Sequence, residues 1–541
     1  MRNKLLTIAS VCLILMLATL PMACAEVEPG PTPGPGPGPT PGPGPTPPTP
    51  PTAEPQYGGI LRLGSTVAPI VLGYPPTQSR SDDRPMFGTC LETLLRYNKE
   101  AELVPFLATS WKEDAEALTV ILTLREGVKF HDGTDFNAEA VKWNLDQFLA
   151  MERAELQAVE SVDAIDDYTV RLNLSGYDEG TLNYLAGHAG YMISPTAFEE
   201  HGQEWCENNP VGTGPFKFVS WEKDVSIKFE RFDDYWQEGL PYLDGVTWFT
   251  MRDPMTAKIS FLAGELDVLT MVDPQDAPDI AAAGKVVALT DAPGELEVGF
   301  PDGGHDYSAW SNLKVRQAAA HAINRQAIAD AMGYGYWTPT NQRAPEGTWY
   351  YNPDVVGYPY NPEKARELLA EAGYSDDGFK TTLYVNAVSA YRVLIVTAIQ
   401  GYFDEIGIDV EIDTMEQSRF HNLAVVGGYE HGAAFLWNQT SEPVIISNCW
   451  NFFRPGAILF QGKLHPPEFQ DVMAQAKTEP DFEKRKALVW EMQRLMIDEY
   501  SMLWPLVTMT PIAFKYPEVH GDEINEIVRL QWNPAGAWLS R

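Results

Sequence analysis

The feature that most limits how this chain can fold is a run of 23 residues, 29–51, that contains only Pro, Gly and Thr. Such a run has no side chains with which to bury a core, and its prolines favour the extended polyproline II conformation. At ~3.1 Å per residue it can reach on the order of 70 Å. The run therefore divides the 541-residue chain into a short N-terminal segment and a long body that begins near residue 57.

The segment before this run has the pattern of a secretory signal. Arg2 and Lys4 precede an apolar run, Leu5–Leu20, and small residues follow it. At about 16 residues the apolar run is shorter than the ~20 that cross a bilayer as a helix. A cleaved signal peptide and an uncleaved short anchor both fit this pattern.

A third interpretation is a lipoprotein signal, which the segment Leu20–Cys24 (LPMAC) resembles. In that pattern the Cys is lipid-modified and becomes the new N-terminus, although an aliphatic residue is usual where Pro21 stands. The resemblance implies a signal peptide over 1–23, a lipid on Cys24 and a linker over 24–56 that holds the body at the membrane.

The charge of the chain argues against some partners. It has 74 acidic and 39 basic residues, a net charge of −35 and a pI near 4.5. Nucleic-acid binding depends on clustered Lys and Arg, and anionic membranes attract basic segments, so neither is expected as a binding surface. With 44% apolar and 11% aromatic residues, the body is globular rather than disordered.

From residue 57 onward, β-patterned runs alternate with amphipathic helical stretches, as is typical of an α/β protein. The pattern predicts strands at Leu118–Leu124, Tyr168–Leu174 and Ile408–Asp413, and a hairpin from Phe216–Val219 and Ser226–Glu230. It predicts helices at Lys314–Met332, Glu363–Ala372, Ala390–Ile406 and Phe482–Tyr500.

The chain contains none of the short motifs that mark common enzymes. The HExxH, GxSxG, CxxC and Gly-Lys-Ser/Thr patterns are missing, so zinc proteases, serine hydrolases, dithiol redox enzymes and phosphate-loop NTPases lack their motif. His131 is interpreted as part of a turn rather than as a metal ligand or general base. Cys90, Cys206 and Cys449 imply no disulfide framework, though one pair plus a free thiol would fit. We expect no catalytic residue, no metal and no cofactor.

Eight segments of the body read, in order, GGILR (58–62), LVPFLATSW (103–111), REGVKFHDGTDFNAEAV (125–141), NPVGTGPFKFVSW (209–221), FDDYWQEGLPYLDGV (232–246), LAGELDV (262–268), VRQAAAHAINRQAIADA (315–331) and NPEKARELLAEAGY (361–374). Together they resemble the extracytoplasmic solute-binding proteins of family 5, which serve peptide, nickel and some sugar ABC importers. The resemblance covers about residues 57–541.

The resemblance implies an α/β, two-lobed periplasmic-binding-protein type II-like fold with a hinged ligand cleft. Lobe one would comprise 57–296 plus 501–541, with an extra subdomain near 90–200, and lobe two 297–500. The protein would be an extracytoplasmic monomer that captures a small solute, peptide-like, oligosaccharide or otherwise polar, and delivers it to the permease subunits of an ABC importer.

The resemblance also indicates a ligand site. In peptide-binding members a Trp, then an Asp that binds the peptide ammonium group, then a Pro follow a strand of lobe two. The matching segment here is Ala434–Pro443 (AFLWNQTSEP), which keeps Trp437 and Pro443 but has no Asp between them. The expected ligand-binding residues are Trp437, Asn438, Gln439, Thr440, Glu442 and Trp450. A buried ammonium needs a carboxylate, so we expect the preferred ligand not to be a free-amine di- or oligopeptide.

Two other functions stay open. One is a secreted hydrolase with an unrecognised carboxylate pair, which would turn over its bound ligand. The other is a sensory or chaperone module that binds ligands without an importer. A co-purified ligand that leaves the protein unchanged would favour a receptor over the hydrolase.

Overall fold

The computed structural model describes residues 54–77, 84–98, 102–289, 294–374, 378–387, 390–427, 432–439, 444–457, 459–521 and 532–541. Glu54–Arg541 forms one compact unit. The expected signal peptide, Cys24 and the linker as far as residue 53 lie outside the described residues. In the described part of the chain, no helix is both long and apolar enough to cross a membrane.

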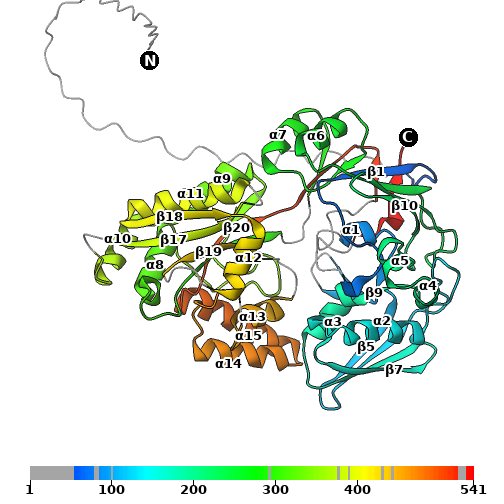
Figure 1. Ribbon diagram of the computed structural model, residues 1–541, viewed down its shortest axis with the longest axis horizontal. Helices are drawn as coiled ribbons and strands as arrows, with labels where there is room; N and C mark the ends of the chain where they lie inside the picture. The colour runs from blue at the N-terminus through cyan, green and yellow to red at the C-terminus, as the bar shows by residue number, and fades with distance from the viewer. Residues whose placement is uncertain are drawn as a thin grey trace, which may run out of the picture. The chain divides into compact units, whose positions relative to one another are not determined.

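Two large mixed sheets form the framework of the body (Figure 1). The seven-stranded sheet has the order β10 (Phe216–Glu222), β11 (Ser226–Arg231), β12 (Gly245–Thr250), β1 (Ile60–Ser65), β13 (Val268–Leu269), β21 (Ile512–Lys515) and β14 (Val286–Leu289). The six-stranded sheet has the order β16 (Trp337–Pro339), β20 (Trp504–Met509), β15 (Glu295–Pro301), β19 (Ala434–Gln439), β17 (Phe379–Asn386) and β18 (Ile408–Met415). Each sheet with its helices is called a lobe below.

The first lobe carries a further antiparallel sheet. Its strands are β5 (Ala108–Asp114), β6 (Thr119–Leu124), β8 (Thr169–Leu174) and β7 (Val159–Asp166), with helix α2 (Ala138–Ala150) packed against it. Alternating side chains of β6 and β8 are buried, because only one face of this sheet meets the core. Two-stranded pairs are β2 (Glu92–Thr93) with β9 (Tyr191–Met192), β3 (Leu95–Tyr97) with β4 (Leu103–Pro105), and β22 (Val519–His520) with β23 (Trp538–Leu539).

The helices fall into two groups along the chain. Those of the first half are α1 (Arg84–Phe87), α3 (Gly180–Leu185), α4 (Pro195–His201), α5 (Gln203–Asn208), α6 (Pro254–Leu262) and α7 (Ala277–Ala282). Those of the six-stranded lobe are α8 (Leu313–Ala322), α9 (Arg325–Gly333), α10 (Pro362–Glu371), α11 (Ala390–Glu405), α12 (Gln417–Val426), α13 (Ile445–Phe453), α14 (Pro467–Thr478) and α15 (Phe482–Arg494).

Most of the predicted elements are confirmed, but one predicted helix is wrong. The stretch Lys314–Met332 was expected to be continuous, whereas the chain forms α8 and α9 with a break at Ile323 and Asn324. Ile323 has an extended backbone, and the side chain of Asn324 accepts a hydrogen bond from the amide of Ala327. Asn at this place stabilises a new helix start, which the apolar periodicity alone conceals.

The chain passes between the two sheets at two adjacent places. One crossing leads from β14 to β15, and the other leads from β20 to β21. The crossings approach so closely that a Cβ atom on Gly294 would lie 1.7 Å from the carbonyl oxygen of Met509, so only glycine fits there. β20 pairs with β15 and β16 of the six-stranded sheet, whereas we expected residues 501–541 in lobe one. The other lobe borders stay a prediction.

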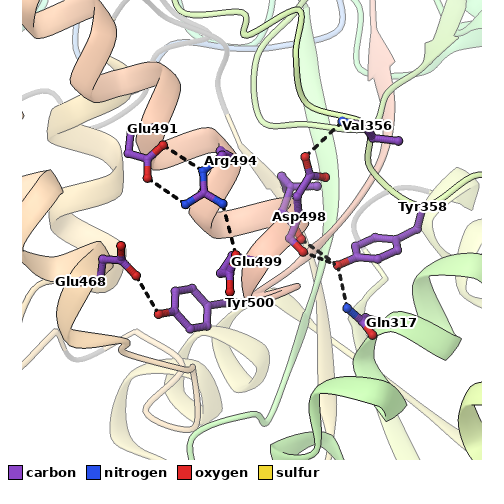
Figure 2. Close-up of polar contacts among 10 residues, drawn as sticks. Gln317, Val356, Tyr358, Glu468, Glu491, Arg494, Asp498, Glu499 and Tyr500 are labelled. Atoms are coloured by element: carbon purple, nitrogen blue, oxygen red, sulfur yellow. Dashed lines mark hydrogen bonds and ion pairs between the residues drawn. The ribbon is translucent and has the colours of Figure 1, made fainter.

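A polar network holds the loop after β16 to the π-helical turn Leu495–Glu499, which follows α15 (Figure 2). The carboxylate of Asp498 accepts hydrogen bonds from the amides of Val356 (3.1 Å) and Gly357 (2.8 Å). The Tyr358 hydroxyl donates to the carbonyl oxygens of Ile497 and Asp498, each at 3.0 Å. This network fixes the loop against the residues that precede β20 in the chain. β20 is the strand that leads back to the first lobe.

The two lobes also meet at the start of α3. Asp178 forms an ion pair with Lys477 of α14, and the amide of Glu179 donates to the Lys477 carbonyl oxygen at 3.2 Å. A Cβ atom on Gly180 would lie 2.7 Å from Ser447 Oγ of α13, which shows how closely α3 approaches the second lobe. These contacts hold the lobes together on the side away from the crossing strands.

Glu179 is a buried acid at this contact. It is 7% exposed, one carboxylate oxygen accepts a hydrogen bond from Asn183 (3.1 Å), and the other has no partner among the described residues. Burial, helped by the charge of Asp178, raises the pKa of Glu179 to about 7. The charged groups that face it are Asp178, Glu113, Lys477 and Arg485.

The raised pKa predicts a pH-dependent stability. Because Glu179 keeps its proton in the folded protein up to about pH 7 but loses it near pH 4.5 when unfolded, stability should fall as the pH rises through this range. Glu179→Gln removes this loss. We expect its Tm to exceed that of the wild type by about 2–4 °C at pH 8 and to be equal to it at pH 5. The exposed Glu199→Gln serves as the control, and an equal difference at both pH values would contradict the prediction.

Candidate functional site

The candidate site lies at one edge of the six-stranded sheet. Strands β17, β18 and β19 run parallel, so their carboxyl ends at Asn386, Met415 and Gln439 lie along the same edge. β15 starts at this edge because it pairs antiparallel with β19, and β20 ends there. In α/β sheets, ligands bind beyond the carboxyl ends of parallel strands. Here that edge also lies beside the crossings to the first lobe.

A buried ion pair stands at this edge. Arg392, in the first turn of α11, donates from Nε to Glu297 of β15 at 2.8 Å and from Nη1 to the Asn386 side-chain oxygen at 3.0 Å. The side chain of Arg392 is 7% exposed and that of Glu297 is 0% exposed. Among the described ion pairs, this is the one in which both side chains are over nine-tenths buried. The Tyr391 hydroxyl also donates to Glu297, at 3.3 Å.

Each charge of this pair depends on the other. Burial raises the pKa of Glu297, although the charge of Arg392 opposes the shift. Burial alone would lower the pKa of Arg392, but Glu297 more than offsets this and the pKa is raised. The guanidinium is thus fixed by two partners, while its Nη2 makes no hydrogen bond to a described residue. The arrangement is suited to holding an acidic group of a ligand.

Sequence reasoning did not identify this ion pair. Arg392 is the only basic residue among the 16 residues of α11, and a lone cation in an apolar helix was a usable indication. Glu297 is separated from it by almost a hundred residues and occurs in a run that reads as an ordinary strand. Nothing in the sequence joins them, because β15 comes near α11 only when β15 pairs with β19 and β19 pairs with β17.

Trp437 belongs to an aromatic cluster on one face of the same sheet. Its ring stacks on Phe420 of α12 at 5.4 Å and 22°, and meets Phe460 edge-on at 5.2 Å. Phe300, on β15, stacks with Phe460 (5.3 Å) and with Phe452 of α13 (5.7 Å). Phe420 covers one face of the Trp437 indole. The Trp437 side chain is half-buried, so part of it remains accessible.

The other predicted site residues are placed as follows. Asn438 and Gln439 are the last two residues of β19, and in the strand register Asn438 is opposite Glu297. Thr440 and Glu442 lie outside the described residues. Trp450 is half-buried in α13, and Lys477 lies over its ring at 5.7 Å. Trp437 and Trp450 pack against the same core, while Trp450 lies nearer the contact with the first lobe.

His131 and the three cysteines have ordinary structural surroundings. His131 Nε2 donates to the Gly214 carbonyl oxygen at 2.9 Å, its Nδ1 accepts from the Gly212 amide at 3.3 Å, and burial lowers its pKa to about 4. Both ring nitrogens are therefore engaged with the turn. Cys90, Cys206 and Cys449 are buried free thiols, so the possible disulfide is not formed. The described residues contain no cluster of three or more His, Cys, Asp or Glu that could hold a metal.

Comparison with known proteins decides the family. The model of the bacterial extracellular solute-binding proteins, family 5 (middle region), matches residues 102–456. The chain belongs to this family. The expected function, a ligand-binding receptor of an ABC importer, is thereby confirmed as a class, as is the α/β two-lobed fold.

Characterised relatives support this assignment. The chain is 36% identical over 340 residues to the glutathione-binding protein GsiB of Pectobacterium atrosepticum. The aligned region covers 60% of this chain and 63% of that protein, which is less than two thirds of that protein's length. It is 36% identical over 415 residues to GsiB of Shigella flexneri, covering 73% and 78%. The fold matches the DppA protein of Helicobacter pylori, in complex with the peptide STSA, with a TM-score of 0.73, 24% identity and coverage of 90% and 99%. These relatives are binding proteins.

The buried ion pair can be tested apart from ligand binding. Arg392→Met leaves the Glu297 carboxylate buried without a partner, so we expect a loss of about 3–5 kcal/mol in the free energy of unfolding. Adding Glu297→Gln removes the unpaired charge and should restore most of the loss. Chemical denaturation measures both changes. Lys314→Met, in the exposed pair with Glu371, is the control and should cost less than about 1 kcal/mol. A double variant no more stable than Arg392→Met would contradict the interpretation.

Proposed function

We propose that this protein captures a small peptide-like solute between its two lobes and delivers it to the permease subunits of an ABC importer, as a monomer and without catalysis. The observation that carries the proposal is the Arg392 guanidinium, fixed by Glu297 and Asn386 at the carboxyl ends of the parallel strands. The relatives named as glutathione- and peptide-binding support a peptide-like solute, although the segment at Trp437 predicted that the preferred ligand is not a free-amine peptide.

In this proposal Arg392 binds an acidic group of the solute. A guanidinium that is already fixed loses little conformational freedom when it pairs with a carboxylate, which strengthens the interaction. Trp437 would cover the apolar part of the solute, as half-buried aromatic rings do in ligand sites. Asn438, Gln439, Thr440, Glu442 and Trp450 stay proposed ligand-binding residues, and the first three carry neutral hydrogen-bonding groups.

The amine of the solute has a smaller role. In this segment, peptide-binding members have an Asp that pairs with the ammonium group, and here Asn438–Ser441 carry no charge. The solute's carboxylate should therefore contribute more to affinity than its amine.

A ligand panel tests the proposed function. We expect glutathione and trialanine to bind in calorimetry and to raise the Tm, because a ligand that binds only the folded state stabilises it. Amidating the carboxyl terminus of trialanine should weaken binding at least about tenfold, since each charge-assisted bond contributes about 1.5–3 kcal/mol, and acetylating its amine should weaken it less than about threefold. Maltotriose and spermidine should not bind.

Trp437→Ala should weaken peptide binding, while Trp205→Ala, on the surface of α5, is the matched control. Binding of a peptide that is abolished by acetylation of its amine, but unaffected by amidation, would overturn this assignment of the solute's groups. Binding of maltotriose in place of any peptide would overturn the peptide-like class.

The second part of the proposal is a lipid anchor at Cys24. Such an anchor would keep the receptor at the outer surface of the membrane, and the spacer 29–51 would give it reach. We expect the wild type to fractionate with membranes and Cys24→Ser to appear in the soluble fraction. Cys90→Ser, which changes a buried thiol in the body, is the control and should leave fractionation unchanged. Membrane association that persists in Cys24→Ser would contradict the proposed lipid anchor.

A further inference from the structure

Two buried cations of the six-stranded lobe lack the partners that its other buried cations have. Arg343, in the loop after β16, is 4% exposed, and Lys463, between α13 and α14, is 2% exposed. Arg392 has an acidic partner, and Arg316 and Arg325 each donate to the carbonyl oxygens of four residues. Among the described residues, no Asp or Glu forms an ion pair with either Arg343 or Lys463.

The two cations lie around one aromatic ring. The guanidinium carbon of Arg343 and Nζ of Lys463 are 5.6 and 5.5 Å from the centroid of Phe452. Arg343 donates from Nη1 to the sulfur of Cys449 at 3.0 Å, while its Nε and Nη2 make no hydrogen bond to a described residue. Lys463 donates to the carbonyl oxygen of Leu459. These contacts compensate for only part of the cost of removing two charges from water.

Burial and mutual repulsion both act against these charges. Burial lowers the pKa of each, and the charge of Arg343 helps to bring that of Lys463 to about 7. His465 and Cys449 are the other titratable groups beside them, and burial disfavours the charged form of both. The chain has 74 acidic residues from which a counter-charge could have come. An acidic ligand would provide the missing partner.

The cation pair belongs to the same aromatic cluster as Trp437. Lys463 lies 5.5 Å from the ring of Phe460, and Phe460 is 5.2 Å from the ring of Trp437. Cys449 and Phe452 are on α13, the helix that follows residues 440–443 of the predicted ligand segment. The two cations therefore belong to the aromatic cluster on the face of the sheet that carries Trp437.

We propose that Arg343 and Lys463 form an anion-binding subsite of the solute site, so that the preferred solute is a peptide-like molecule with at least two acidic groups. This rests on the proposed function, in which one acidic group pairs with Arg392. The second group would accept hydrogen bonds from Nε and Nη2 of Arg343 in the forked geometry that suits a carboxylate. Lys463 would add a point charge, and Phe452 and Phe460 would contact the aliphatic part.

The test compares an acidic and a simple peptide on the full-length protein. The probes are glutathione, with two carboxylates, and trialanine, with one. We expect Lys463→Met to weaken glutathione binding at least about tenfold and to change trialanine binding less than about twofold. Without ligand the same variant should have a higher Tm, because it replaces an unpaired buried charge with an apolar chain of similar length. Arg343→Gln should weaken glutathione selectively too, and Lys380→Met, 87% exposed, is the matched control.

The outcomes separate this inference from the proposed function. If Lys463→Met lowers the Tm and weakens both peptides equally, the lysine is structural and the inference fails. If both peptides bind with unchanged affinity to Lys463→Met and Arg343→Gln, the inference fails while the proposed function stands. If neither peptide binds the wild type, the proposed function fails. The subsite is then tested by the effect of succinate on the Tm. Stabilisation of the wild type by succinate that is lost in Lys463→Met supports the subsite, and equal stabilisation overturns it.

Discussion

The site depends on the buried ion pair between Glu297 and Arg392. It joins β15, the strand that enters the six-stranded sheet from the first lobe, to the first turn of α11 and, through Asn386, to the end of β17. Because neither charge is stable alone in this interior, the three elements must take up one relative position. The same constraint fixes the orientation of the guanidinium at the sheet edge. A structural requirement of the fold thus also prepares a group for binding.

The second lobe is otherwise built around aromatic rings. Phe300 and Trp437 come from neighbouring strands, Phe420 and Phe452 from helices and Phe460 from a loop, so the cluster exists only when the whole lobe is folded. Buried cations at its border are costly unless something pairs with them. In contrast, the contact of Asp178 with Lys477 is paired across the lobes and needs no ligand. The buried cations at the aromatic cluster are suited to recognition of a solute. The paired contact of Asp178 with Lys477 is suited to closure of the lobes around it.

Local patterns predicted much of the secondary structure. The strands β6 and β8, the hairpin of β10 and β11, and the helices α10 and α11 follow the expected ranges within a few residues, because each has its own periodicity and a clear stop such as Gly373 or Gly407. The helix predicted over Lys314–Met332 failed because a single Asn cap interrupts a continuous apolar pattern. The sequence did not indicate which sheet β20 joins, because the sheet that a buried strand joins depends on pairing partners far away in the chain.

For this protein, the sequence by itself determined the class: an α/β solute-binding body behind a Pro/Gly/Thr spacer, with Trp437 at the end of a strand. Those features are local or follow the order of motifs along the chain. Only the tertiary structure decided which charges meet. Glu297 pairs with Arg392, and Arg343 approaches the ring of Phe452, across about a hundred residues in each case. Lys463 reaches the same ring from a nearby part of the chain. Pairing of buried charges is a long-range consequence of sheet order and helix packing, and no local pattern encodes it.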